Sequence, residues 1–156
     1  MQEEVQKKEN KRMIEDDTIK LLRECDAGVK MGISSIDDVI EYVSEEDFRK
    51  DLKECRNQHI KLKDEMLDLL REYGDTGKEP DPVAKGMSWV KTNVKLALNE
   101  SDKTIAGLIT DGCNMGVKSL NKYLNQYKAA DEKSKNIAKK LIRLEEKLET
   151  DIRRYL

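Results

Sequence analysis

The residues that could perform metal or acid–base chemistry in this chain are few. His59 is the single histidine, and Arg56 stands three positions before it. A di-iron site between helices uses two Glu-x-x-His pairs and two further glutamates, and this spacing does not occur here. The weak candidates for metal ligands are Glu24, His59, Asp111 and Asp151. We therefore predict no metal and no other cofactor.

The helical geometry expected for the chain keeps Glu24 away from His59. A turn near residue 44 would place Glu24 beside residue 65, six residues from His59, which is about 9 Å along a helix. Asp111 lies about one turn from Asp151 across the second predicted helical hairpin. We expect these two acids to pair with each other or with Lys or Arg side chains.

Three cysteines offer the remaining reactive groups, and their spacing favours a structural role. Cys25, Cys55 and Cys113 form no Cys-x-x-Cys pair and have no metal-ligand spacing. Free cysteine is usually a small buried hydrophobic residue. The chain also lacks a Gly-x-Ser-x-Gly elbow and a phosphate-binding glycine loop. Enzymatic activity is not predicted.

The composition is that of a helical protein with a charged exterior. Of 156 residues, 40% are charged and 37% hydrophobic, with two prolines. The 30 basic and 32 acidic side chains are interspersed and give a net charge of −2, so no basic surface indicates a nucleic-acid partner. We find neither an apolar run of about 20 residues nor a signal-peptide pattern, so no membrane association is expected and the predicted location is cytoplasmic.

Apolar residues at three- and four-residue steps predict helices that would position these side chains. The predicted helices span about 17–43, 45–73, 89–98, 101–127 and 131–155. In the second helix the expected inward row is Leu52, Cys55, His59, Leu62, Met66, Leu69 and Tyr73, and in the last it is Ile137, Leu141, Leu144, Leu148, Ile152 and Tyr155. The corresponding apolar rows of the first and third long helices are Leu21, Leu22, Cys25, Val29, Ile36, Val39, Ile40 and Val43, and Ile105, Leu108, Ile109, Leu120, Leu124 and Tyr127. Residues 1–16 read as a charged N-terminal extension, either helical or disordered, and residues 17–156 as the helical domain. We expect Ser44 and Asp131 to cap the helices that follow them, and Ser101 with Asp102 to begin another. The chain breaks most strongly at 74–81.

A glycine pattern occurs twice, 84 residues apart. Gly28 and Gly32 in the first half correspond to Gly112 and Gly116 in the second, which favours two structurally related hairpins. Glycine inside a helix costs about 1 kcal/mol relative to alanine, so something must offset that cost. The offset is either close packing, for example around Tyr123 or another large aromatic residue, or a ligand cavity.

At several of these residues the chain resembles the ferritin-like proteins. Within that group it resembles a bacterial family to which no function is assigned. In the first helix the similar positions are Leu21 and Leu22 with Cys25, Asp26, Gly28 and Gly32; later ones are Gly86–Lys91 and Asp111–Tyr127. The family tends to have a histidine before the tryptophan and another late in the last helix, and both are missing here. The resemblance implies the fold, but it does not extend to a metal site.

These observations predict an all-α, antiparallel ferritin-like four-helix bundle of two hairpins, with the third helix broken near residues 99–102. The predicted role is helix–helix association without an intact di-iron site, in a homodimer. A different protein partner is a further alternative. The competing prediction is a metal- or small-ligand-binding protein with a non-standard site.

Overall fold

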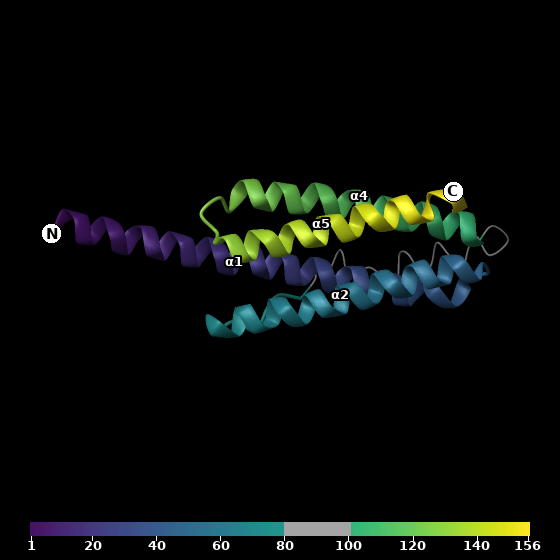
Figure 1. The fold of residues 1–156 in the computed structure, drawn as a ribbon, viewed down its shortest axis with the longest axis horizontal. Helices are drawn as coiled ribbons and strands as arrows, with labels where there is room; N and C mark the ends of the chain where they lie inside the picture. Colours follow the sequence, from purple (N-terminus) through teal and green to yellow (C-terminus); the bar gives the residue numbers. More distant parts are fainter. Residues whose placement is uncertain (80–100) are drawn as a thin grey trace.

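A computed structural model describes residues 1–79 and 101–156, and the ordered elements in these ranges are all helical (Figure 1). They are α1 (Gln2–Val39), η1 (Ile40–Tyr42), α2 (Glu46–Glu72), α4 (Ser101–Gln126), α5 (Glu132–Ile152) and η3 (Arg153–Tyr155). The predicted helix at 89–98 and the first half of the predicted break at 99–102 lie outside the described residues.

Four helices pack against one another to form what we call the four-helix core. Figure 1 shows α2 folded back along α1, and α5 along α4. α5 packs against each of the other three helices, and α1 also contacts α4. This arrangement confirms the predicted all-α class with four packed helices. In the described part of the chain no helix is both long and apolar enough to cross a membrane.

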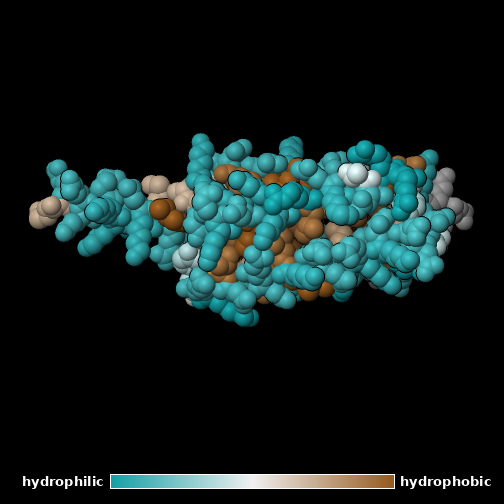
Figure 2. Space-filling view, viewed as in Figure 1, coloured by the Kyte–Doolittle hydropathy of each residue, from teal (hydrophilic) through white to brown (hydrophobic). Residues whose placement is uncertain are grey.

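The first helix is much longer than the others and projects beyond them at its N-terminal end (Figure 1). Residues 1–16 are exposed, and Thr18 is the first buried residue. The sequence of α1 explains why burial begins at Thr18. Thr18 and Cys25 lie on the side of the helix that faces the core, and the earlier positions on that side are occupied by Lys7 and Lys11, which are charged. The projecting part is mainly hydrophilic in Figure 2.

The core consists of two apolar clusters, one towards each end of the packed helices. The first contains Leu21, Leu22, Cys25, Val29, Leu62, Met66, Leu70, Leu120, Ala130, Ile137, Ala138, Leu141 and Ile142. The second contains Ile36, Val39, Val43, Phe48, Leu52, Cys55, Ile105, Ala106, Ile109, Cys113, Leu148 and Ile152. Most are residues of the predicted inward rows. In the last turn of α2 the buried residue is Leu70, whereas the sequence pattern indicated Leu69.

One predicted helix cap is confirmed and one is wrong. Asp131 caps α5, since its Oδ1 accepts a hydrogen bond of 2.8 Å from the backbone N–H of Ser134. Ser44 does not cap α2, which has Glu45 at the N-cap position without a side-chain bond. The backbone N–H groups of Ser44 and Glu45 instead donate to Asp102, at 2.8 and 2.9 Å. The carboxylate of Asp102, at the start of α4, therefore binds the chain just before α2, where the sequence predicted a contact from the hydroxyl of Ser44.

The predicted break after α2 is a turn that contains two glycines with positive φ. Gly74 has φ +70° and Gly77 φ +91°, a conformation in which a side chain is strained. The turn ends the second helix and leads residues 75–79 across α1.

Candidate functional site

A polar layer separates the two apolar clusters, and each of the four helices contributes one residue to it. Gly32 of α1 lies between Val29 and Ile36, and His59 of α2 between Cys55 and Leu62. Gly116 of α4 and Glu145 of α5 occupy the matching positions on the other two helices. This layer places an ionisable pair at the centre of the four-helix core.

Both ring nitrogens of His59 have hydrogen-bond partners. Nδ1 lies 2.8 Å from the carbonyl oxygen of Cys55, and Nε2 lies 2.8 Å from Oε1 of Glu145. A carbonyl only accepts, so Nδ1 must carry a hydrogen atom. The Nε2 contact holds a second proton, which can lie on the ring or on the carboxyl group; on the ring, it makes the pair an imidazolium and a carboxylate.

The pair is almost completely removed from water. The side chain of His59 is 1% exposed and that of Glu145 13% exposed. Burial, the largest influence, lowers the pKa of His59, but its contacts with Cys55 and Glu145 outweigh it and raise the pKa to about 10. The charged form of His59 is therefore the stable one at neutral pH.

The glycines of the layer provide the space for this pair. A Cβ atom on Gly32 would lie 2.9 Å from two ring atoms of His59, and one on Gly116 would lie 3.6 Å from the Glu145 carboxylate. Close packing therefore offsets the cost of Gly32. The large side chains that pack against Gly32 and Gly116 are His59 and Glu145, and not Tyr123, which served as the example. Gly107 and Gly112 differ, because no atom of the described residues lies within 4 Å of a Cβ there.

The three cysteines are buried and form no disulfide, which confirms their predicted burial. Burial, followed by the charges of Glu24 and Asp26, raises the pKa of Cys25 to about 12. Burial and the neighbouring Glu145 also raise the pKa of Cys113. A protonated thiol is a poor nucleophile, so these two side chains are unreactive at neutral pH.

Two buried oxygen atoms of α4 and α5 lack a hydrogen-bond partner within the described residues. They are Oγ1 of Thr110 and Oε1 of Glu149. Burial, with a contribution from Glu145, raises the pKa of Glu149. Glu149 is therefore a second partly buried acid close to the layer.

Residues 75–79 are tied to one face of α1 by several polar contacts. The backbone N–H of Lys78 donates to Oδ2 of Asp26 at 2.9 Å, and its side chain donates to Glu24. Lys30 contacts the same Asp26 oxygen at 2.8 Å. Gly77 fits tightly here, since a Cβ would lie 2.3 Å from Asp26. Glu24 is therefore an anchor for the turn.

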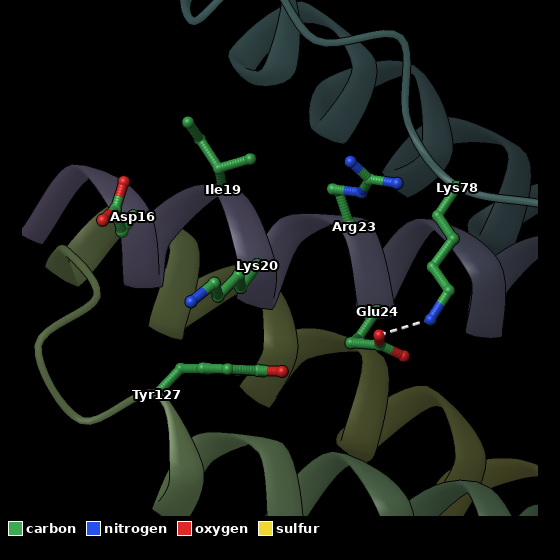
Figure 3. A pocket seen from close by; sticks show the side chains of 7 residues that line it. All are labelled: Asp16, Ile19, Lys20, Arg23, Glu24, Lys78 and Tyr127. Atoms are coloured by element: carbon green, nitrogen blue, oxygen red, sulfur yellow. Dashed lines mark hydrogen bonds and ion pairs between the residues drawn. The ribbon is translucent and has the colours of Figure 1, made fainter. Parts of the chain in front are cut away.

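An open pocket of about 360 Å³ lies beside this anchor, between α1 and the end of α4 (Figure 3). It is lined by Asp16, Ile19, Lys20, Arg23, Glu24, Lys78 and Tyr127. In Figure 3, Lys20 and Glu24 lie on the side of α1 that faces Tyr127, while Ile19 and Arg23 point away from it. The pocket carries charges of both signs and one aromatic ring.

The four weak metal-ligand candidates lie apart from one another. Glu24 pairs with Lys78 and His59 with Glu145, while Asp151 pairs with Lys147 and Asp111 is exposed on α4. No group of three or more His, Cys, Asp or Glu residues suited to a metal ion occurs in ranges 1–79 and 101–156. The expected pairing of Asp151 with a basic side chain is confirmed.

Sequence reasoning missed Glu145, although its spacing contains the signal. Leu141, Glu145, Leu148 and Ile152 follow steps of four, three and four, which is the pattern of an inward-facing row. The predicted row used Leu144, which is only partly buried. An acid on such a row indicates a buried cation on a neighbouring helix, and the single histidine was the available partner.

The fold and this layer define the class as an all-α protein of four packed helices with a buried histidine–glutamate pair. Comparison with known proteins found no matching family model, no matching curated protein and no matching solved structure.

Proposed function

We propose that this chain is a structural or interaction protein that acts through helix–helix association in a homodimer, without a di-iron site. The closed polar layer is the observation that best supports the absence of a di-iron site. Both nitrogens of His59 are used in hydrogen bonds, and Gly32 and Gly116 contribute no ligating side chain to the layer. Binding a metal would require the imidazolium to lose a proton and the Glu145 contact to break.

The proposal includes the finer architecture that the sequence indicates. The chain would be an antiparallel ferritin-like bundle of two related hairpins, of a kind found in bacteria and located in the cytoplasm. The similar places of Gly32 and Gly116 beside the same ion pair support the internal relationship. Gly28 and Gly112 differ, since only Gly28 has a neighbour, Leu141.

The experiment is a measurement of mass and metal content on the full chain, purified without chelators. Light scattering should give the mass of a dimer, and elemental analysis should find metal far below one atom per chain. A monomer over the whole concentration range would contradict association. One or two metal atoms per chain, lost in both His59→Ala and Glu145→Gln variants that keep their helical circular dichroism, would contradict the metal-free core.

The open pocket favours one alternative, the binding of a small ligand. Its volume of about 360 Å³ lies within the range usual for ligand sites, and its mixed charges suit a molecule that carries both an amine and a carboxylate. Thermal unfolding with a panel of free amino acids tests this alternative. A raised unfolding temperature that disappears in Lys20→Ala and Tyr127→Ala would favour ligand binding, whereas no shift would favour association.

A further inference from the structure

The outer face of α4 combines an exposed hydrophobic side chain with unfilled glycine positions. Met115 is 70% exposed, and in ranges 1–79 and 101–156 no atom lies within 4 Å of a Cβ on Gly107 or Gly112. Each such glycine costs about 1 kcal/mol in a helix. Contacts inside the described chain do not offset this cost at Gly107 and Gly112.

The other exposed large hydrophobic side chains do not form a comparable face. Within the described ranges they are Met1, Val5, Met13 and Ile14 of the projecting helix, and the C-terminal Leu156. Val5 and Ile14 lie nine residues apart, and therefore on opposite sides of a helix. The projecting part of α1 thus presents no continuous apolar stripe.

The outer face of α4 carries Asp111, Lys118 and Lys122, and the first two are placed so that they can pair between two copies. Asp111, Met115 and Lys118 are exposed and stand at positions i, i+4 and i+7, which lie on one side of a helix. In an antiparallel pair of α4 helices related by a two-fold axis at Met115, Lys118 of the second copy comes beside Asp111, because the two residues lie on the same flank of Met115. The ammonium group of the lysine then reaches the Asp111 carboxylate.

We propose that α4 pairs with α4 of a second copy in this antiparallel register. The two-fold axis repeats the Asp111–Lys118 pair, so the face forms two ion pairs around a central Met115–Met115 contact. The partly buried Leu108 lies seven residues before Met115, on the same side, and extends the apolar strip. The inference rests on the proposed homodimer and specifies which surface forms it.

Charge reversal on the full chain tests the register. Asp111→Lys and Lys118→Asp each place like charges opposite one another in both of the symmetry-related contacts. Each should raise the dissociation constant of the dimer at least about tenfold, measured by sedimentation at low salt. The double variant Asp111→Lys/Lys118→Asp restores opposite charges and should recover the wild-type constant. Added salt should weaken the wild-type dimer and strengthen the single variants.

The matched controls are Lys139→Asp and Glu146→Lys, which change the same charges at exposed positions seven residues apart on α5. They should leave the dissociation constant unchanged. A wild-type chain that stays monomeric would overturn the homodimer itself. A dimer that both single variants and the double variant leave intact, with circular dichroism unchanged, would overturn only the α4 register.

Discussion

His59 and Glu145 form an ion pair in a layer with apolar clusters on both sides, so each group is stable only while the other is present. Removing one partner leaves a buried charge uncompensated, whereas replacing both with apolar side chains removes the desolvation cost as well. The pair therefore determines which helices face each other more than it adds to stability.

A double-mutant cycle measures this dependence. His59→Leu alone should lower the free energy of unfolding by about 3 kcal/mol, because Glu145 would remain charged and buried. Glu145→Leu should cost a similar amount. The double variant should recover most of the loss in urea unfolding. Losses that simply add would show that the two groups act independently.

The same pair makes stability depend on pH. The pKa of His59 in the folded chain, about 10, is above its unfolded value of 6.5. The contribution is therefore complete below about pH 6.5 and declines as the pH rises towards 10. Urea unfolding at pH 6, 8 and 9.5 should show falling stability.

His59→Gln is the control for the pH dependence, because cysteines and other groups also titrate at high pH. Glu145, Cys55 and Cys113 lie near His59 from α5, α2 and α4, and all three remain in this variant. The difference in stability between wild type and variant should shrink with rising pH. A difference that is constant from pH 6 to 9.5 would refute a raised pKa.

At the scale of the helices, the glycines fall into two groups that a pair of alanine substitutions can separate. Gly32→Ala brings a Cβ to 2.9 Å from the His59 ring, which two hydrogen bonds hold in place. It should destabilise the chain by about 1–3 kcal/mol despite the better helix propensity of alanine. Gly107→Ala brings its Cβ no closer than 4 Å to any atom of the described part of the chain and should stabilise the fold by about 0.5–1 kcal/mol. Equal effects in urea unfolding would contradict the distinction.

The local patterns of the sequence predicted the helices well, and contacts between distant segments explain what they missed. The rows that include Leu52 and Leu141, and the cap at Asp131, depend on neighbours within a few residues. Asp102 binds the start of α2 from 57 or 58 positions away, which no local pattern reveals. The partner of His59 is 86 residues distant, and of the four candidate site residues only His59 lies in the layer.

Asp102 thus stabilises the start of a helix to which it does not belong. Asp102→Ala removes the acceptor for two backbone N–H groups, which water can partly replace because the contacts are exposed. We expect a loss of about 1 kcal/mol, similar to the loss of an ordinary N-cap. Lys103→Ala, at an exposed position on the same helix, is the control and should change the unfolding free energy little. A loss no greater than that of the control would contradict a capping role.

At the scale of the whole molecule, the packed part of α1 begins where a connection between helices is bound to it. The N–H groups of Ala129 and Asp131 donate to Asp17 and Thr18 at 2.9 and 2.8 Å. Before these residues α1 is exposed. Because the extension continues a helix that is already packed, it can be helical without the free-energy cost of nucleating a new helix. Opposite charges four residues apart, such as Glu3 and Lys7, also favour its helical form.

The extension should therefore add helix without adding much stability or any self-association. A chain that begins at Met13 keeps the contacts of Asp17 and Thr18. It should lose helical signal in circular dichroism in proportion to the missing residues, while its free energy of unfolding changes by less than about 1 kcal/mol. Its dissociation constant should equal that of the full chain, because the proposed contact lies on α4. A truncated chain that is monomeric where the full chain is dimeric would instead place the association on the projecting helix. Because Val5 and Ile14 lie on opposite sides of that helix, such a result would require different faces of the two copies to meet.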